Sequence, residues 1–339
     1  MQKFYTNLFL AAIIINLLLT GCSTWKVSRA GQQKISGKTY VIIGASSGFG
    51  RGIAEELGRY GANVVLAARR TGLLADIATT IRTLGGKAQV VTMDISKAQD
   101  VQRVADAALQ QYGKIDVWIN MAGVGAIGRF WDIPDEDQAR IIDVNLKGII
   151  YGSKVAVKQF MKQGNGVLIN MGSVDSETPL AYQASYSASK AGVRNFSLAI
   201  GQELRLHGYK NIKVVTIEPW AVDTPWWRHA ANYSGVEPKM ALMDEPDKVV
   251  NAVIRKSLRP KKIVPVGYKA KFSSFMANVF PRFNEHLTGN ISHKYQLKMP
   301  PKAADTTGSI YKPMDEGRGV DDGVNERLKE NKKLRKHKD

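Results

Sequence analysis

The chain has almost no cysteine. Cys22 is the only one among 339 residues, so an intrachain disulfide is impossible and metal sites built on cysteine pairs are excluded. The five histidines form no cluster with the spacing of metal ligands. We therefore expect a protein whose fold and chemistry depend neither on disulfides nor on a bound metal.

Acidic residues are scarce relative to basic ones. The chain carries 48 lysines and arginines against 30 aspartates and glutamates, which gives a formal net charge of +18. This excess favours anionic partners, but no nucleic-acid-binding module is recognisable in the sequence. Anionic lipid or a phosphorylated cofactor is therefore the partner that we expect, and nucleic acid is not.

The apolar run near the N-terminus is short. It extends from Leu8 to Thr20, whereas a membrane-spanning helix needs about 20 apolar residues. The length suits the hydrophobic region of a signal peptide. The letters "LTGC", followed by serine, resemble the lipobox of bacterial lipoproteins, in which the cysteine is lipidated and becomes the mature N-terminus. We therefore expect residues 1–22 to be a signal peptide that leaves Cys22 lipid-anchored in a bacterium; the alternatives are an uncleaved membrane anchor or a buried helix with an incidental cysteine.

The side of the membrane stays open. Lipidation requires export, which would place the protein outside the cytoplasm. The distribution of positive charge argues against export. Only Lys3 and the N-terminal amine carry positive charge before the run, whereas four basic residues follow it: Lys26, Arg29, Lys34 and Lys38. The positive-inside rule would keep the segment that follows on the cytoplasmic face. Attachment to a membrane is common to both interpretations.

From Lys38 onward, strand-like apolar runs alternate with helical patterns. The runs are "KTYVIIGAS", "NVVLAAR", "AQVVTMDIS", "IDVWINMAG", "GVLINMGSV", "IKVVTIEPW" and "KIVPVG". Such alternation predicts a parallel sheet with right-handed crossovers. We predict an α/β fold, a doubly wound, Rossmann-like sheet in one catalytic domain over 37–268, with its ligand at the carboxyl ends of the strands. A polar tether over 23–36 precedes it, a small extension over 269–300 follows, and 301–339 is expected to be a polar, disordered tail.

A glycine-rich turn lies directly between the first strand and its helix. In "GASSGFG" the glycines are Gly44, Gly48 and Gly50. Glycine lets the backbone turn tightly and approach a pyrophosphate, which then sits at the positive amino end of the helix. The turn therefore indicates a dinucleotide site.

Five motifs in order resemble those of a classical short-chain dehydrogenase/reductase. They are "GASSGFG" at 44–50, "NMAG" at 120–123, "DVNLKG" at 143–148, "MGSV" at 171–174 and "YSASK" at 186–190. Each lies at the strand or helix end where that family has it. The resemblance covers the chain from about Lys38 to Gly267 and implies hydride transfer between a nicotinamide cofactor and a carbonyl or alcohol.

The motif "YSASK" contains the predicted acid–base group. On a helix, Tyr186 and Lys190 share one face, and an ammonium beside a phenol lowers the phenol pKa from its usual value of about 10. The resemblance makes Tyr186 the acid–base and has Lys190 also bind the ribose hydroxyls. It further implies that Ser173 orients the substrate oxygen and that Asn145 holds a proton-relay water. Tyr182 is expected to be a pocket wall or a surface residue.

The end of the second strand predicts the choice of cofactor. NAD enzymes place a carboxylate there, whereas NADP enzymes place a cation for the 2′-phosphate. The chain has Arg69 and Arg70 and no acid, so NADP(H) is preferred over NAD(H). The cofactor-binding residues implied by the resemblance are Gly44, Ser46, Ser47, Gly48, Phe49, Gly50, Arg69, Arg70, Asp94, Ile95, Asn120, Ala122, Gly123, Tyr186, Lys190, Pro219, Val222 and Thr224.

Three positions depart from the family pattern. Ile43 replaces the threonine before the first glycine, Met121 replaces the second asparagine of the usual "NNAG", and Trp220 replaces the glycine after Pro219. The first two look like tolerable packing changes. Trp220 is bulky enough to reshape the site close to the nicotinamide.

The loop over about 220–245 is rich in aromatic residues. These side chains either pack on one another or line a pocket for an apolar substrate such as a lipid, a steroid or a long-chain carbonyl; they are Trp220, Trp226, Trp227 and Tyr233.

The sequence thus predicts an NADP(H)-dependent oxidoreductase that interconverts a carbonyl and an alcohol at a membrane, as a single chain or a homo-oligomer. The alternative is a non-catalytic NADP(H)-binding sensor or scaffold. The complete set of Tyr186, Lys190, Ser173 and Asn145 argues against it, because a pure binder needs none of the chemistry of Tyr186. An isomerase or dehydratase usually carries a larger C-terminal substrate domain than the polar tail could form.

Overall fold

The computed structural model describes residues 26–240, 242–299, 301–324 and 326. The apolar run Leu8–Thr20, Cys22 and residues 327–339 lie outside these ranges, so the expected signal peptide or anchor stays a prediction. Within the described part of the chain, no helix combines the length and the apolar character needed to cross a bilayer.

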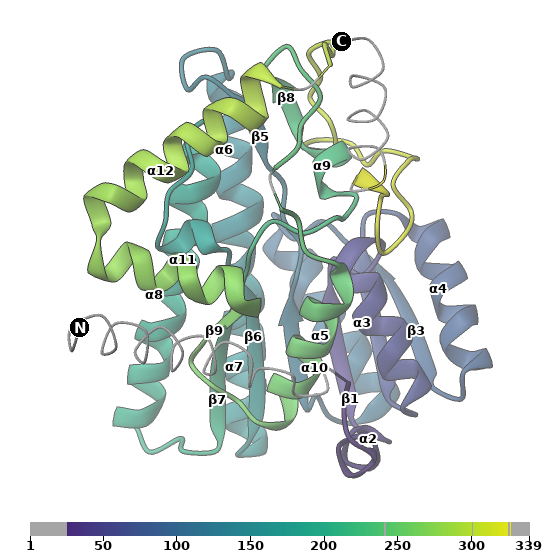
Figure 1. Ribbon diagram of the computed structural model, residues 1–339. Coiled ribbons are helices and arrows are strands. Elements are labelled where there is room, and N and C mark those ends of the chain that lie inside the picture. The colour runs from purple at the N-terminus through teal and green to yellow at the C-terminus, as the bar shows by residue number, and fades with distance from the viewer. Residues whose placement is uncertain (1–25, 241, 300, 325, 327–339) are drawn as a thin grey trace, which may run out of the picture.

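A seven-stranded sheet forms the centre of the molecule (Figure 1). Its order is β3-β2-β1-β4-β6-β7-β9, and all neighbours pair in parallel. The predicted doubly wound α/β sheet is therefore confirmed. The strands are β1 (Thr39–Ile43), β2 (Asn63–Ala68), β3 (Lys87–Thr92), β4 (Val117–Asn120), β6 (Gly166–Met171), β7 (Ile212–Pro219) and β9 (Ile263–Val266).

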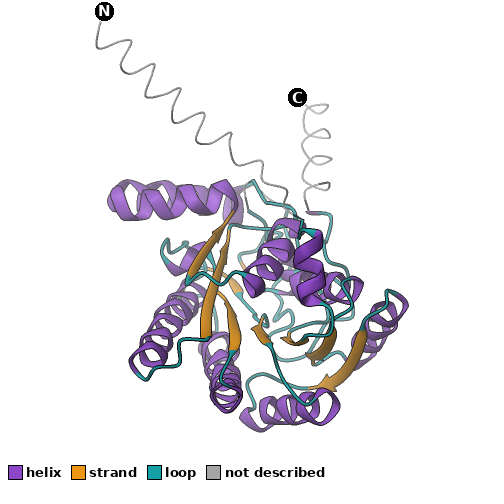
Figure 2. Cartoon of the chain, turned by 90° about the horizontal axis from the view of Figure 1, so that it is seen from below, coloured by secondary structure: helices purple, strands orange, loops and turns teal. Residues whose placement is uncertain are grey.

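Helices cover both faces of the sheet, as the view from below shows (Figure 2). Along β1, Tyr40 and Ile42 enter one hydrophobic core, whereas Val41 and Ile43 enter the other. Burial on both faces explains why the strands read as continuous apolar runs. The first core packs under α3 (Gly48–Arg59), α4 (Thr71–Thr83) and α10 (Pro246–Leu258), and the second under α5 (Ala98–Tyr112), α7 (Gly148–Gln163) and α8 (Ala184–Leu206).

Shorter elements lie around these layers. They are α2 (Arg29–Ile35), α6 (Asp135–Ile142), α9 (Trp226–His229), α11 (Gly267–Val279), α12 (Pro281–His293), a 3-10 turn at Val174–Ser176, π-helical turns at Asp143–Lys147 and Lys294–Lys298, and a small parallel sheet of β5 (Ala126–Gly128) and β8 (Ala231–Tyr233). The helices α11 and α12 occupy the segment expected to be a C-terminal extension.

The segment expected to be a polar tether contains α2. Ser28 caps this helix by accepting a hydrogen bond from the Gly31 backbone N–H. Val27 and Ile35 are buried, and the helix packs against α10. Two apolar residues eight positions apart gave too weak a periodic signal to predict the helix.

The expected disordered tail differs from the structure over residues 301–324. This segment, yellow in Figure 1, runs past α9 towards the start of α3. Asn232 pairs with Thr306 through the backbone, and Ile310 and Val324 are buried. Its backbone carbonyls accept hydrogen bonds from cationic side chains, which the polar composition of the segment did not reveal.

Candidate active site

A pocket of about 250 Å³ opens at the carboxyl edge of the sheet. Open α/β sheets bind their ligands at this edge. Its walls are the residues that follow β1, β2, β4, β6 and β7, together with α9 and part of the C-terminal segment.

The turn between β1 and α3 forms one wall. Gly44 has a φ of +92°, and a Cβ on it would stand 2.6 Å from the backbone N of Ala122. A Cβ on Gly50 would stand 2.1 Å from the carbonyl oxygen of Gly44. Only glycine permits both contacts. The result is a turn that brings the amino end of α3 to the pocket, where backbone N–H groups can bind phosphate.

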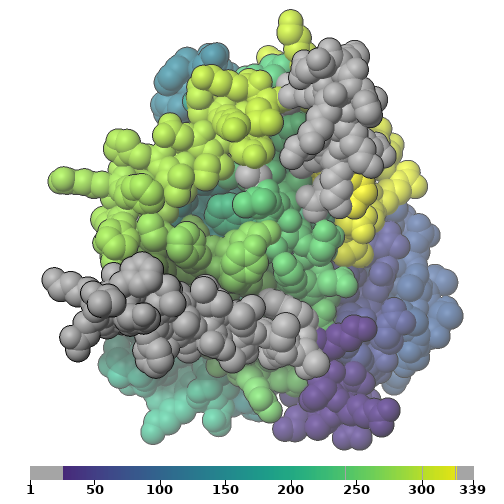
Figure 3. All heavy atoms as spheres, in the orientation of Figure 1, coloured from purple at the N-terminus to yellow at the C-terminus, as the bar shows by residue number. Residues whose placement is uncertain are grey.

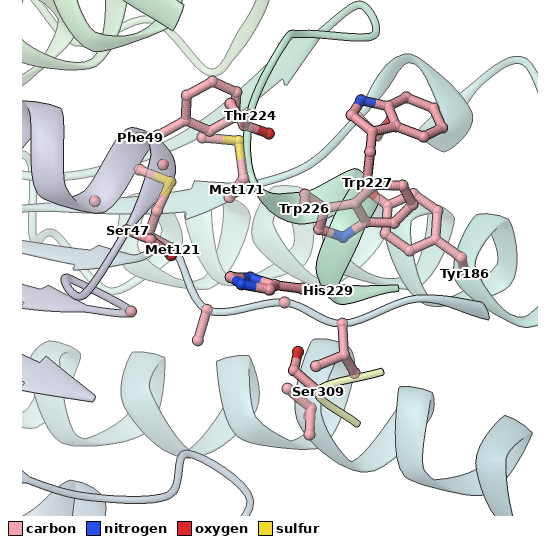
Figure 4. A pocket seen from close by; sticks show the side chains of 18 of the residues that line it. Ser47, Phe49, Met121, Met171, Tyr186, Thr224, Trp226, Trp227, His229 and Ser309 are labelled. Atoms are coloured by element: carbon pink, nitrogen blue, oxygen red, sulfur yellow. The ribbon is translucent and has the colours of Figure 1, made fainter. Parts of the chain in front are cut away.

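Tyr186, Ser173 and Lys190 meet in the same pocket. Lys190 follows Tyr186 by one turn of α8, and its Nζ lies 5.5 Å from the centroid of the tyrosine ring. The Lys190 ammonium donates a hydrogen bond to the Met171 carbonyl at 2.8 Å, at the end of β6. Ser173 follows the same strand. The ring of Tyr186 lies beside Trp226 (Figure 4).

The pKa of Tyr186 differs from the expectation. Burial raises the pKa, and the Asp175 carboxylate raises it further, whereas a hydrogen bond with Ser173 lowers it. Lys190 stands over the ring, and burial lowers its own pKa to about 8. The expected lowering of the Tyr186 pKa by the Lys190 ammonium is therefore not found, and burial dominates. The pocket holds the phenol protonated, which suits a proton donor.

Asp175 is a buried carboxylate that the sequence analysis did not identify. It is 4% exposed and accepts hydrogen bonds from Ser173 Oγ at 3.1 Å and Ser187 Oγ at 3.2 Å. Burial raises its pKa to about 6, although these hydroxyls and the Lys190 charge act in the opposite direction. An aspartate two residues after a strand-end serine is no signal by itself, because surface turns have the same pattern.

Two predicted residues do not line the pocket. Asn145 lies in a π-helical turn, where its side chain accepts from Val124 N and donates to the Val124 carbonyl, both at 2.8 Å. Asn120 is fully buried, accepting from Trp118 Nε1 and donating to Asn170 Oδ1, both at 2.8 Å. Both amides brace the backbone behind the site.

Arg69 and Arg70 follow β2, as predicted, but the C-terminal segment lies across them. Arg69 donates to the Ser309 carbonyl at 2.6 Å. Arg70 donates to Ser47 Oγ at 2.6 Å and to the Met314 carbonyl at 3.2 Å. Peptide oxygens therefore take the place in which we expected a phosphate.

Asp94 lines the same part of the pocket and pairs with Arg140 at 2.7 Å. Burial acts to raise the pKa of Asp94, but hydrogen bonds from Ser96 and Arg140 outweigh it, so that the pKa lies below its usual value. Arg140 also donates to the Ile310 carbonyl at 3.3 Å. This arginine, one of several polar residues on α6, gave no signal in the sequence.

Aromatic side chains form another wall. The Trp226 ring lies 5.2 Å from that of Tyr186 and 5.0 Å from that of Trp227, between centroids. Trp220 lines the pocket as well. In Figure 4, Thr224 and Ser309 lie on opposite sides of His229. The three tryptophans of this loop thus line the pocket, whereas Tyr233 does not and donates its hydroxyl hydrogen bond to Asp137.

The pocket unites most of the predicted site. Tyr182 is not among the lining residues, and its hydroxyl lies 2.6 Å from His293 Nδ1 on α12. Unpredicted lining residues include Asp175, His229 and Met314. The predicted residues that line it are Gly44, Ser46, Ser47, Gly48, Phe49, Gly50, Arg69, Arg70, Asp94, Ile95, Ala122, Gly123, Ser173, Tyr186, Lys190, Pro219, Val222 and Thr224.

This chain is similar in sequence and fold to known proteins. A family model described as short chain dehydrogenase matches residues 38–233. The chain belongs to the short-chain dehydrogenase family. Within the family, an uncharacterized oxidoreductase of Bacillus subtilis (strain 168), YxnA, is 31% identical over 86% of this chain and 81% of its own length.

A 3beta-hydroxysteroid dehydrogenase 1 of Eggerthella lenta is 35% identical over 56% of this chain and 73% of its own length. The crystal structure of a metagenomic short-chain oxidoreductase in complex with NADP is 28% identical, covers 68% of this chain and 96% of that chain, and has a TM-score of 0.57. Solved relatives hold NADP-type or NAD-type cofactors. This chain is an oxidoreductase of the short-chain dehydrogenase family.

Tyr186→Phe tests the acid–base assignment. The variant keeps the ring beside Trp226 but loses the proton donor, so turnover should fall about 100- to 10,000-fold while cofactor affinity, measured by fluorescence titration, is retained. The matched control is Tyr182→Phe, which lies outside the pocket and should have a mild effect. Near-normal turnover in Tyr186→Phe would rule out Tyr186 as the acid–base.

Asp175→Asn tests the buried carboxylate through the pH dependence of stability. A folded-state pKa of about 6, above the ordinary 3.8, means that the favourable contribution of Asp175 is complete below about pH 4 and is lost as the pH rises through about 6. The variant should therefore gain up to about 3 kcal/mol in free energy of unfolding relative to wild type between pH 4 and 7, by urea titration. Asp106→Asn, at an exposed carboxylate, is the control. A gain that does not change with pH contradicts the assignment.

Proposed function

We propose that this chain is an NADP(H)-dependent oxidoreductase that interconverts a carbonyl and an alcohol, with Tyr186 as its acid–base. The observation that supports this most is the meeting of Tyr186, Ser173 and Lys190 in one pocket. As hydride reaches a carbonyl carbon, negative charge grows on the oxygen and must be met by a donor. A protonated Tyr186 meets it in reduction and takes the proton back in alcohol oxidation.

The residues around the pocket fit a nicotinamide cofactor, which supplies or accepts the hydride when bound. The glycine turn offers N–H groups at the amino end of α3, and Lys190 can donate to ribose hydroxyls. Ser173 orients the substrate oxygen, while its hydrogen bond to Asp175 holds the serine side chain in place. Asn145 acts indirectly, by positioning the Val124 backbone.

Preference for NADP(H) is supported by the two guanidinium groups after β2. The hydrogen bonds that Arg69 and Arg70 donate to peptide carbonyls show that their N–H groups face this part of the pocket. A phosphate is a stronger acceptor than a carbonyl, because it is charged. Asp94 cannot serve as the ribose-binding acid of an NAD site, since it follows β3 and pairs with Arg140.

An apolar substrate is supported by the apolar side chains that line the pocket. Trp226, Trp227 and Met240 line the pocket next to Tyr186, and such surfaces favour apolar ligands. A relative named as a hydroxysteroid dehydrogenase has a substrate of this character. We propose an apolar ketone, aldehyde or secondary alcohol.

Membrane attachment through residues 1–22 is part of the same proposal, on the grounds of the apolar run and Cys22 alone. The mass of the mature N-terminus tests it. A diacylated Cys22 supports the lipoprotein, an intact Met1 supports the anchor, and full-length protein found only in the soluble fraction opposes both.

Arg69→Ala tests the cofactor preference. The wild type should bind NADPH about ten- to a hundredfold more tightly than NADH, because charge-assisted hydrogen bonds contribute about 1.5–3 kcal/mol. The variant should lose most of this ratio. We use the ratio of the two affinities because any effect of the variant on the part that both cofactors share cancels in it. Arg103→Ala, on the exposed side of α5, is the control, and equal affinities in the wild type would refute the preference.

A further inference from the structure

An apolar face is exposed on α11 and α12. It consists of Tyr268, Phe272, Phe275, Val279, Phe280, Phe283 and Leu287, and we call it the hairpin face. The side chains recur at intervals of three or four residues, so each helix carries them on one side. These seven account for more than half of the thirteen large hydrophobic side chains exposed in the described part of the chain. Figure 3 shows the yellow-green atoms of the two helices projecting from one side of the molecule.

The inward side of the hairpin is small and polar. Ser273 and Asn284 are buried and donate hydrogen bonds to Thr178 Oγ1, both at 3.3 Å. Thr288 and Ser292 are buried as well. A helix on a water-facing surface turns its apolar side inward, and this hairpin does the opposite. The exposed apolar side chains are therefore not the ones that attach the hairpin to the rest of the protein.

The sequence in and just before the hairpin is rich in cations. From Arg255 to Lys298 the sequence has ten lysines and arginines and a single acid, Glu285, which amounts to half of the net charge of the chain. Burial lowers the pKa of Lys256, and the nearby charges of Arg255, Lys261, Arg259 and Lys271 lower it further. The cations at the end of α10 thus lie near Lys271 of α11, and we call this group the positive zone; Lys269 of α11 pairs with Asp244 at 2.8 Å.

We propose that the hairpin face docks on the surface of an anionic membrane. Phenylalanine and tyrosine side chains enter the boundary between head groups and acyl chains, and lysine and arginine side chains pair with lipid phosphates. A second copy of the chain fits less well, because two positive zones would then face each other. The hairpin also contacts the segment between Asp175 and Tyr186, through Ser274 with Glu177 and His293 with Tyr182, although neither Glu177 nor Tyr182 lines the pocket itself. Docking therefore places the pocket near apolar molecules dissolved in the bilayer.

Vesicle partitioning of the full chain tests the proposal. On phosphatidylcholine with about 30% phosphatidylserine, the combined variant Phe272→Ser/Phe275→Ser/Phe283→Ser should lose at least about 100-fold in partition coefficient, since each buried phenylalanine contributes about tenfold. Pure phosphatidylcholine should bind the wild type less. The control Phe130→Ser/Trp131→Ser removes two exposed aromatics outside the hairpin and should bind like wild type. All the proteins keep residues 1–25, whose contribution is therefore equal.

A fluorescent label distinguishes contact by the hairpin from retention by the N-terminal segment. In a Cys22→Ser chain, an environment-sensitive dye on Phe283→Cys should shift to the blue on anionic vesicles, whereas the dye on Trp131→Cys should not. Equal partitioning of wild type and the combined variant, with no shift at either position, overturns the proposal. Self-association without lipid that the combined variant abolishes also overturns it, in favour of a second copy.

A second, independent observation concerns residues 309–319, which we call the strap. The strap accepts two hydrogen bonds in addition to those donated by Arg69 and Arg70. The Gly48 N–H of the glycine turn donates to the Gly319 carbonyl at 2.9 Å, and Arg51 donates to the Arg318 carbonyl at 2.8 Å. The strap is held at both ends. Ile310 is fully buried, and beyond the strap Asp322 pairs with Arg228 at 3.0 Å.

We infer that the strap competes with the cofactor phosphates for these donors and is displaced when NADP(H) binds. Its carbonyls use the same guanidinium groups and the same amide that the proposed function, on which this inference rests, assigns to phosphate. A carbonyl carries a partial charge and a phosphate a full one, so the exchange favours the cofactor. The strap thus acts as a built-in competitor that sets the apparent affinity for NADP(H).

Hydrogen exchange of the full chain tests the displacement. Deuterium uptake over 309–319 should rise at saturating NADPH and rise less with NADH, which lacks the 2′-phosphate, while α12 should not change. Asp322→Asn, which loosens the strap outside the pocket, should speed NADPH association severalfold. Unchanged or slower uptake with NADPH bound overturns the strap inference and leaves the proposed function standing. Failure to bind NADPH at all overturns both.

Discussion

Gly50 packs so closely against the carbonyl oxygen of Gly44 that a Cβ at position 50 would stand 2.1 Å from that oxygen. This contact lets β1 pass into α3 within a single tight turn. Because the same turn packs on Ala122 after β4, it also fixes how the two central strands end. The pocket, the amides at the start of α3 and the strand ends that carry Ser173 and Arg69 all lie along the edge that this turn defines. A side chain at either glycine would therefore disturb several walls at once.

The chemistry at that edge depends on charges buried beside one another. Burial drives Asp175 and Lys190 towards their neutral forms, raising the pKa of one to about 6 and lowering that of the other to about 8. The attraction between the two charges offsets part of the free energy that burying them costs. Burial and the Asp175 carboxylate raise the pKa of Tyr186, a hydrogen bond with Ser173 acts in the opposite direction, and the phenol keeps its proton. The arrangement is better suited to donating a proton than to holding a phenolate.

The sequence predicted the features that have a local signature. Apolar runs identified the strands, and glycine spacing identified the turn after β1, because both express a backbone requirement in residue type. The resemblance then placed Ser173, Tyr186 and Lys190 in one pocket. Residues whose role arises from distant contacts could not be found in this way. Asp175 is such a residue, because its role arises from its burial and from the hydrogen bond that Ser173 donates to it.

The C-terminal segment could not be predicted for a related reason. It contributes peptide carbonyls, which every residue possesses, so its polar composition suggested disorder where the structure has a defined path over the cofactor-binding edge. Asn145 and Asn120 show the reverse case, since their motifs are intact but their amides brace the backbone behind the pocket. The sequence could identify the side chains of the site, whereas the depth of each side chain and the segment that covers them required the structure.

The central claim is that the pocket transfers hydride between NADP(H) and an apolar carbonyl or alcohol. Single-turnover mixing of the full chain and bound NADPH with a panel of apolar ketones and aldehydes tests it most directly. We expect the absorbance of the reduced nicotinamide to decay for at least one compound, with one equivalent of alcohol formed per NADPH consumed. Tight, saturable binding of NADPH with no decay across the panel would contradict the account and indicate a protein that binds the cofactor without using it.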